Sequence, residues 1–329
     1  MTSKKPRISI IIPTYNRRQL LDECLSSILM QDYNNTEVIV IDDNSNEDIK
    51  GLIKTKHPKV ILITNTSNKG PSFAKNQGIL ASSGTYILFL DSDSELVEKS
   101  TLSKMISILE KDKTIGSLGG EILLDKKGKK SKVVGGGDKK HVYTDENTKI
   151  KRCSYLPTSN CVTRKDIIKK TKGFDPYYFY PMEDTDFGLA IKRLGYTNII
   201  SFDTGALHKY SKNMRLNRIY TLHKTKTRFL IKNYGILKAL SSIPEDINQS
   251  MINPVYSFLT TRKEKSEPSN ETLGPVEHSL VRKLYSFAII PFLLLSAYLW
   301  NILKIKQTIK SRSIDFLDPI NMRNYEKSN

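Results

Sequence analysis

The sequence predicts an α/β fold in which a mostly parallel sheet carries helices on both faces. Near-continuous apolar runs alternate with segments of helical spacing, as expected for strands that are buried on both sides. Polar clusters follow three of the strand candidates, at Pro13–Arg17, Asp42–Ser45 and Asp91–Asp93. Ligands of open α/β sheets bind where the loops leave the carboxyl ends of the strands, so these clusters indicate a binding site.

The elements of the first part alternate in order along the chain. The strand candidates are Ile8–Ile12, Glu37–Ile41, Val60–Thr64 and Tyr86–Leu90. Helical spacing of apolar residues marks Leu20–Met30, Asp48–Thr55, Ser72–Ala81 and Ser100–Leu109. Repeated strand–helix units of this kind predict parallel strands with helices on both sides.

The pattern is less regular in the second part. An apolar stretch around Ile115–Leu124 precedes Lys126–Lys140, which is rich in Lys and Gly and predicts a mobile loop. The later elements are a helix at Arg164–Lys170, a helix at Glu183–Leu194, a strand at Asn198–Phe202 and a basic helix at Ile219–Tyr234. We therefore expect one domain over residues 1–235 and a C-terminal region over 236–329, with a polar linker at 261–278 and an apolar helix at 284–303.

The charge of the chain restricts its partners. There are 52 Lys and Arg against 34 Asp and Glu, a net charge of +18, which implies an anionic partner. A nucleic-acid-binding module would need aromatic residues interleaved with basic ones on one face, and the acidic clusters at the strand ends oppose it. The three cysteines form no disulfide or metal pattern, and Met1–Arg7 is too short and polar for a signal peptide, so a cytoplasmic protein is expected.

Asp91 and Asp93 are the candidate metal ligands. Two carboxylates one residue apart, after a buried strand, can hold Mg²⁺ or Mn²⁺ against a diphosphate. A solvated turn is the alternative for an isolated Asp-x-Asp triplet, and the polar clusters upstream favour the metal.

Other polar residues are candidates for holding a nucleotide. Tyr15 offers an aromatic face and Asp43 an acceptor for a ring N–H, although local packing of Tyr15 and capping of the next helix by Asp43 are alternatives. Gly70 opens a helix whose N-terminus, together with Lys75, suits an anionic ligand.

Two features further along the chain complete the candidate site. The segment Glu183–Asp186 begins a helix, where carboxylates are favoured by the helix dipole, and one of them can serve as a general base. His208 follows a strand and a short turn. A lone histidine is more often structural than a metal ligand.

Taken together, residues 7–210 resemble the family 2 glycosyltransferases and their GT-A fold. The matching segments are Pro-Thr-Tyr-Asn-Arg (13–17), Ile-Asp-Asp-Asn-Ser (41–45), Asn-x-Gly-x-x-x-Ala-Lys-Asn-x-Gly (68–78), Asp-Ser-Asp (91–93), Gly-Phe-Asp (173–175) and Glu-Asp-Thr-Asp (183–186). The part from Gly173 to His208 is most similar to the rhamnosyl- and galactofuranosyltransferase branch. The Lys-rich loop departs from that family's compact acceptor loops.

The resemblance implies a role for each matched residue. Asp184 would be the base of an inverting transfer, with Glu183 as the second choice, and His208 would join Asp91 and Asp93 around the metal. The residues implied for binding the nucleotide sugar are Pro13, Tyr15, Asn16, Arg17, Asp43, Asn68, Gly70, Lys75 and Asp91.

The apolar segment 284–303 has about the ~20 residues of a membrane span. A single crossing would place the lysines after residue 303 outside the cytosol, against the positive-inside tendency. We therefore expect a helix embedded in, or lying on, the cytosolic face of the membrane, with a buried helix or a dimer contact as alternatives.

These observations predict an enzyme. It would transfer a sugar from a UDP- or dTDP-sugar to a glycan or lipid-linked acceptor in cell-surface polysaccharide or glycolipid synthesis. A polyprenyl-phosphate glycosyltransferase is the nearest alternative, although its phosphate acceptor needs no strong base. A nucleic-acid-binding module or an inactive scaffold would be a different class of protein.

Overall fold

The computed structural model describes residues 6–126, 129–133, 144–145, 150–209, 218–252 and 280–328. The chain divides into two compact units. Unit 1 comprises Met1–Phe179, Glu183–Tyr210 and Ile314–Asn329, and unit 2 comprises Tyr180–Met182 and Ser211–Ser313. The sequence was expected to divide at residue 235. In this division the basic helix at 219–234 belongs to unit 2, and residues 314–329 belong to unit 1.

Unit 1 is built on one mixed sheet. Its strand order is β3-β2-β1-β4-β10-β6-β11-β9-β8, with β5 paired to β11 and β7 to β6. The strands are β1 (Ile8–Thr14), β2 (Thr36–Asp42), β3 (Ile61–Thr64), β4 (Tyr86–Leu90), β5 (Ser94–Leu96), β6 (Ile115–Lys126), β7 (Lys129–Val133), β8 (Thr144–Asp145), β9 (Ile150–Cys153), β10 (Asn160–Arg164) and β11 (Thr197–His208).

The first four strands are parallel and confirm the predicted fold class. β1 pairs in parallel with both β2 and β4, and β2 pairs in parallel with β3. β10 then runs antiparallel to β4 and β6, while β11 is parallel to β6. The carboxyl ends of β1, β2 and β4 therefore lie at one edge of the sheet. The polar clusters that follow these strands were predicted to gather there.

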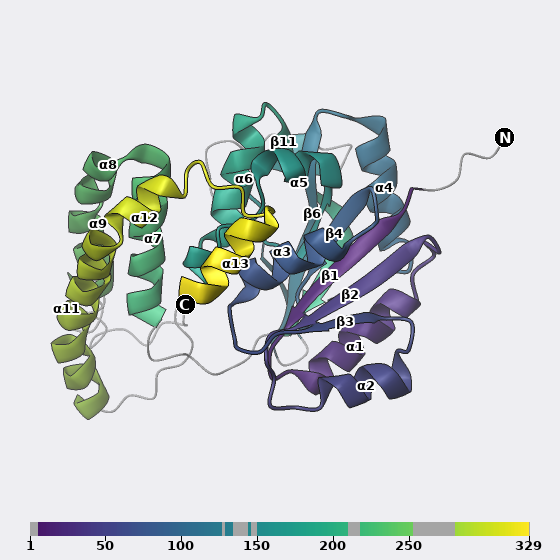
Figure 1. Ribbon diagram of the computed structural model, residues 1–329, viewed down its shortest axis with the longest axis horizontal. Helices are drawn as coiled ribbons and strands as arrows, with labels where there is room; N and C mark the ends of the chain where they lie inside the picture. The colour runs from purple at the N-terminus through teal and green to yellow at the C-terminus, as the bar shows by residue number, and fades with distance from the viewer. Residues whose placement is uncertain are drawn as a thin grey trace. The chain divides into compact units, whose positions relative to one another are not determined.

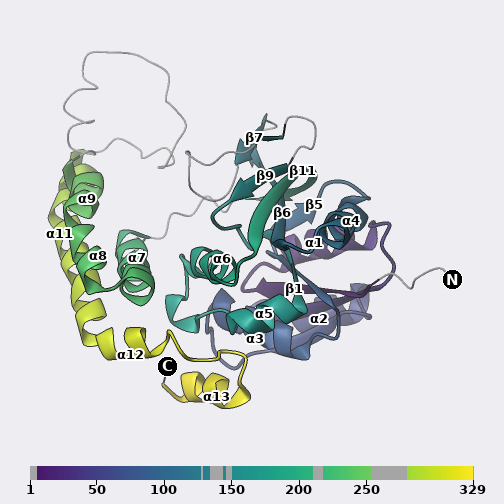
Figure 2. The ribbon, with the colours of Figure 1, turned by 90° about the horizontal axis from the view of Figure 1, so that it is seen from above.

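Helices cover both faces of this sheet (Figures 1 and 2). One apolar core joins the sheet to α1, α2 and α4, and a second joins the opposite face to α3, α5 and α6. These helices are α1 (Arg18–Leu29), α2 (Ile49–Lys56), α3 (Pro71–Ala81), α4 (Thr101–Lys111), α5 (Lys165–Thr171) and α6 (Glu183–Arg193). The short helix η1 (Pro176–Tyr178) and the C-terminal helix α13 (Pro319–Ser328) pack at α3, where Phe73 stacks on Tyr325.

Two elements differ from the sequence prediction. Lys129–Val133, expected within a mobile loop, forms strand β7 and pairs antiparallel with the end of β6. The strand expected to end at Phe202 continues to His208, because it shifts register beside β6 after Ser201 and then resumes pairing at Ala206.

Unit 2 is helical. It contains α7 (Arg218–Tyr234), α8 (Ile236–Ser241), α9 (Ile243–Ile247), the π-helix η2 (Asn248–Ile252), α11 (Leu280–Leu303) and α12 (Ile305–Lys310). The apolar segment 284–303 lies within α11, and the linker expected at 261–278 lies outside the described residues. In the part of the chain that the structure describes, no helix has both the length and the hydropathy needed to cross a bilayer.

Candidate active site at the carboxyl ends of the strands

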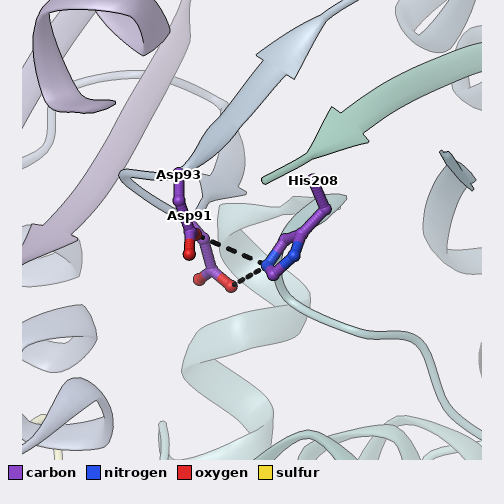
Figure 3. Close-up of side chains that lie close together, drawn as sticks. All are labelled: Asp91, Asp93 and His208. Atoms are coloured by element: carbon purple, nitrogen blue, oxygen red, sulfur yellow. Dashed lines mark hydrogen bonds and ion pairs between the residues drawn. The ribbon is translucent and has the colours of Figure 1, made fainter. Parts of the chain in front are cut away.

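Asp91, Asp93 and His208 converge at the ends of two strands (Figure 3). Asp91 follows β4, and His208 is the last residue of β11. The antiparallel pairing of β5 with β11 places His208 opposite Ser94, next to Asp93. His208 Nε2 lies 3.4 Å from Asp91 Oδ2 and 3.4 Å from Asp93 Oδ1.

Charges around this cluster shift the three pKa values. Burial raises the pKa of Asp91, but the hydrogen bond from His208 and the charges of Lys75, His208 and Arg17 outweigh it and lower that pKa. Burial and the charge of Asp91 raise the pKa of Asp93. Burial lowers the pKa of His208, but its two carboxylate neighbours more than compensate and raise it.

The cluster fits a divalent cation. One ligand atom from each residue lies within 4.8 Å of the other two. Asp93 is 3% exposed, and its Oδ1 accepts no hydrogen bond from any described residue. A buried carboxylate oxygen without a donor is costly, so a ligand that supplies positive charge would satisfy it.

The loop after β1 lies beside the cluster. Arg17 forms an ion pair with Asp93 Oδ2. A residue predicted to bind the nucleotide therefore contacts a residue predicted to bind the metal. Asn16 has a positive φ of 53° and ties its loop to the loop after β2, since its N–H donates to Ser45 Oγ at 2.9 Å. Tyr15 is 40% exposed, so its ring is open to a ligand, while Pro13 is a half-buried residue of β1 paired with Ile41.

Asp43 is buried and orders the segment before α3. It accepts hydrogen bonds from Asn65 Nδ2 at 2.8 Å and from the backbone N–H of Gly70 at 2.7 Å and of Lys69 at 3.0 Å. Burial raises its pKa despite these donors. The helix cap considered for Asp43 is supplied to α2 by Asp48 instead. Gly70 has a positive φ of 85° and precedes α3, while Asn68 is exposed.

A second cluster lies at the start of α6. Lys75 is 2% exposed, and its Nζ lies 3.5 Å from Asp184 Oδ1 and 3.7 Å from Glu183 Oε1. Lys75 also donates a hydrogen bond to Thr158 Oγ1, whose hydroxyl donates in turn to Asp184 Oδ1 at 2.6 Å. The backbone N–H of Thr158 donates to Asp184 Oδ2 at 3.2 Å. Lys75 is therefore a buried partner of these carboxylates, and its binding of an anionic ligand stays a prediction.

The two carboxylates of this cluster differ. Glu183 is 5% exposed, and burial together with the charge of Asp184 raises its pKa to about 8, although Lys75 opposes the shift. Glu183 therefore ionises less readily than an exposed glutamate. Asp184 is 25% exposed at its side chain and receives the donors from Thr158. Of these two side chains, Asp184 is the one that a ligand can reach.

The two clusters share one electrostatic environment. The charge of Asp91 contributes to the raised pKa of both Lys75 and Glu183. The structure thus brings together Asp91, Asp93, His208 and Arg17, and beside them Lys75, Glu183 and Asp184. Thr158 was not found from the sequence, because a single threonine in a connecting segment carries no motif.

Comparisons with known proteins agree with this architecture. Residues 9–171 match the model of the family described as glycosyl transferase family 2. A GalNAc(5)-diNAcBac-PP-undecaprenol beta-1,3-glucosyltransferase from Campylobacter jejuni is 36% identical over 137 residues, which cover 40% of this chain and 43% of that protein. An uncharacterized glycosyltransferase from Haemophilus influenzae is 28% identical over 323 residues, which cover 93% of this chain and 95% of that protein.

The fold is shared more widely than the sequence. The mannosyltransferase PcManGT from Pyrobaculum calidifontis, solved in complex with GDP-Man and Mn²⁺, superposes with a TM-score of 0.56 at 15% identity, covering 91% of this chain and 88% of that one. The matched region spans less than half the length of four curated relatives, from 18% to 43%. The segment that is similar to the glycosyl transferase family 2 model includes Asp43, Asp91 and Asp93 and ends before Asp184 and His208.

Proposed function

We propose that this chain is an inverting, metal-dependent glycosyltransferase that moves a hexosyl or deoxyhexosyl group from a nucleoside-diphosphate sugar to a hydroxyl. The observation that carries the proposal is the convergence of Asp91, Asp93 and His208 at the strand ends of a family 2 domain. Three ligands of this kind leave coordination positions for a diphosphate.

The donor would lie along the sheet edge formed by β1, β2 and β4. The exposed ring of Tyr15 is placed to stack on the base, and buried Asp43 holds the loop that carries Asn68 and leads to Gly70. The donor would be a UDP- or dTDP-sugar. A divalent cation bound by Asp91, Asp93 and His208 would neutralise the charge that develops on the departing nucleoside diphosphate. The imidazole favours Mn²⁺ over Mg²⁺, since Mg²⁺ prefers oxygen ligands.

Asp184 would be the general base. Its carboxylate is oriented by the hydroxyl and the N–H of Thr158, and its exposed side accepts the proton of the acceptor hydroxyl. The freed oxygen attacks the anomeric carbon from the face opposite the diphosphate, so configuration inverts. Neighbouring Glu183 is the second choice, because it is 5% exposed and burial raises its pKa.

The acceptor would be a glycan or a lipid-linked saccharide at the cytosolic face of the membrane. The name of the Campylobacter relative, which includes a diphosphoundecaprenol acceptor, supports this class. The ordered base at Asp184 disfavours a polyprenyl-phosphate acceptor, whose phosphate needs no deprotonation. Placement in the rhamnosyl- and galactofuranosyltransferase branch remains part of the proposal, with His208 as its support.

A donor panel tests the function. UDP- and dTDP-sugars are offered with Mn²⁺ or Mg²⁺, and both thermal stabilisation and donor hydrolysis are measured. We expect one donor to stabilise the protein in a way that EDTA abolishes. A chain that responds to no donor would be the inactive scaffold, and metal-independent hydrolysis would contradict the metal role.

The substitution Asp184→Asn tests the base. We expect turnover to fall at least about 100-fold while donor stabilisation stays within about 1 °C of the wild type, because the amide cannot accept the proton. The matched variant Asp186→Asn changes a carboxylate in the same helical turn that has no assigned role in the reaction. Equal loss of turnover in both variants would remove Asp184 from the role.

A further inference from the structure

Helix α11 of unit 2 has an inverted arrangement of polar and apolar side chains. The inward stripe contains Ala297 and Asn301, both at most 1% exposed. Asn301 Nδ2 donates to Lys224 O on α7 at 2.9 Å. Leu294, 4% exposed, lies on the same inward stripe, which therefore combines one large apolar residue with a small and a hydrogen-bonding one.

The outward stripe of α11 is apolar. It consists of Phe292 (68% exposed), Leu295 (66%), Leu299 (52%), Ile302 (65%) and Leu303 (74%). At 3.6 residues per turn, these five side chains fall within roughly a 100° arc of the helix. We call them the outer face of α11. Five large apolar side chains on one exposed arc mark a binding surface, because soluble proteins rarely leave such a patch in water.

The inward side continues to be polar in α12. The buried guanidinium of Arg228 on α7 donates to Thr308 Oγ1 at 2.8 Å. Thr308 and Ser311 are buried, whereas Lys306 and Lys310 are exposed. The interior of the described bundle thus holds hydrogen-bonding side chains beside apolar ones such as Phe229 and Leu294, whereas the outer face of α11 exposes only large apolar side chains.

Basic residues mark the end of the outer face. Lys304, Lys306, Lys310 and Arg312 are all exposed and follow Leu303 within nine residues. Leucines flanked by lysines match the interface of an anionic membrane, where apolar side chains enter the acyl region and ammonium groups meet phosphates.

We propose that the outer face of α11 binds an anionic lipid bilayer, with the helix lying in the plane of the interface. The inference deepens the proposed function, on which its biological meaning rests, by naming the surface that meets a membrane carrying a lipid-linked acceptor. Charge selects this occupant over a second copy of the chain, since two such surfaces, each edged by four cations, repel one another.

Trp300 provides a reporter beside the outer face. It is the only tryptophan of the chain, lies in α11 and is partly exposed, with the Lys224 ammonium 4.3 Å from its ring centroid. Its fluorescence therefore reports on this helix alone. With vesicles of phosphatidylcholine and phosphatidylglycerol, we expect a blue shift of its emission and quenching by brominated acyl chains.

Three double variants of the full chain, one of them a control, test the surface by vesicle co-sedimentation. Leu295→Gln with Leu299→Gln should weaken vesicle binding at least about tenfold. The matched pair Leu29→Gln with Leu80→Gln alters leucines of unit 1 that are 71% and 46% exposed and should change binding less than twofold. Lys304→Gln with Lys306→Gln should weaken binding to anionic vesicles about 25-fold and have little effect on neutral ones.

Several results would overturn the inference. The inference fails if the chain binds neutral and anionic vesicles equally, or if vesicles leave the emission of Trp300 unchanged. It also fails if the Leu295 and Leu299 double variant binds vesicles as the wild type does. Concentration-dependent dimerisation that buries Trp300 would assign the surface to a second copy. Vesicle binding is measured without donor, and donor hydrolysis without vesicles, so a failure of the inference is distinguishable from a failure of the proposed function.

Discussion

Thr158 is the residue whose contribution is least visible in the sequence. Its hydroxyl accepts from the Lys75 ammonium and donates to Asp184 Oδ1, so one oxygen connects a buried cation to the proposed base. Because Lys75 and Thr158 are both 2% exposed, water cannot readily replace either partner. We infer that Thr158 is a positioning residue that fixes the orientation of the Asp184 carboxylate.

Thr158→Val removes this hydroxyl and keeps the shape of the side chain. We expect kcat to fall about tenfold at an unchanged donor KM, because Asp184 loses one orienting hydrogen bond. Thr158→Ser restores the hydroxyl and should recover most of the rate. Steady-state kinetics of the three proteins check this, with urea denaturation as a control for folding. A serine variant as slow as the valine variant would argue against positioning.

Glu183 makes the free energy of unfolding depend on pH. Its pKa in the folded protein is about 8, above the ordinary value of 4.5, owing to burial and the charge of Asp184. Between these values the folded chain keeps a proton that the unfolded chain has released. Stability therefore falls as pH rises through this range, by up to about 1.4 kcal/mol per pH unit.

Glu183→Gln should remove this contribution, because glutamine imitates the neutral acid and does not titrate. Urea denaturation at pH 5.5, 7 and 8.5 measures the difference in unfolding free energy between the two proteins. We expect the variant to gain on the wild type as pH rises toward 8 and the difference to level off above it. A difference independent of pH would show that Glu183 ionises normally.

At the residue scale, the sequence indicated which polar residues lie near one another better than it indicated which side chains pair. Asp91, Asp93 and His208 do converge, although His208 was indicated only by resemblance, because a lone histidine is more often structural than a metal ligand. Arg17 and Lys75 were predicted to meet an anionic ligand, which stays a prediction, and the structure adds that each contacts a carboxylate of the protein. Which of several nearby carboxylates a lysine meets depends on packing between distant elements, which a local motif does not specify.

At the scale of elements, the pairing of β6 with β11 decides where His208 lies. Ser201 pairs with Gly120, whereas Ala206 already pairs with Ile122, so residues 202–205 face only residue 121. The bulge interrupts the apolar pattern at polar residues, which explains why a strand ending at Phe202 was predicted. Regular parallel strands such as β1 and β4 were located within two residues, because their apolar runs are continuous.

Gly120 leaves room for this bulge. A Cβ at this position would lie 1.6 Å from Thr204 O and 2.2 Å from Asn160 Nδ2. Backbone atoms cannot yield cheaply, so Gly120→Ala should lower the free energy of unfolding by about 3 kcal/mol. The displaced strand also moves His208, and Mn²⁺ should then stabilise the variant less than the wild type in thermal denaturation.

Gly205→Ala is the matched control for this substitution. It lies in the same bulge, but its Cβ would meet no atom closer than 3.5 Å, to Glu121 O. We expect a change below about 1 kcal/mol and an unaltered response to Mn²⁺. Equal destabilisation by the two substitutions would mean that the bulge as a whole, rather than contact at Gly120, resists added volume.

At the scale of the whole molecule, the two units are stabilised by different physical means. Unit 1 has two extensive apolar cores on either side of its sheet. The described part of unit 2 relies more on buried polar contacts, including Asp246, which is 0% exposed. Asp246 accepts from Lys226 Nζ at 2.5 Å and from Tyr298 Oη at 2.9 Å, and these donors, with His223, lower its pKa to about 2 against the effect of burial.

This difference predicts two thermal transitions, of which only one responds to metal. The candidate cation ligands all belong to unit 1, so Mn²⁺ should raise the transition of that unit and leave the other in place. Asp246→Asn should instead lower the transition temperature of unit 2. We expect its free energy of unfolding to fall by about 2 kcal/mol or more, since the substitution leaves Lys226 without its carboxylate. Differential scanning calorimetry with and without Mn²⁺, on both proteins, separates these effects. A single transition that both Mn²⁺ and Asp246→Asn displace as a whole would mean that the units unfold together, and the distinct cores would then not act as separate cooperative units.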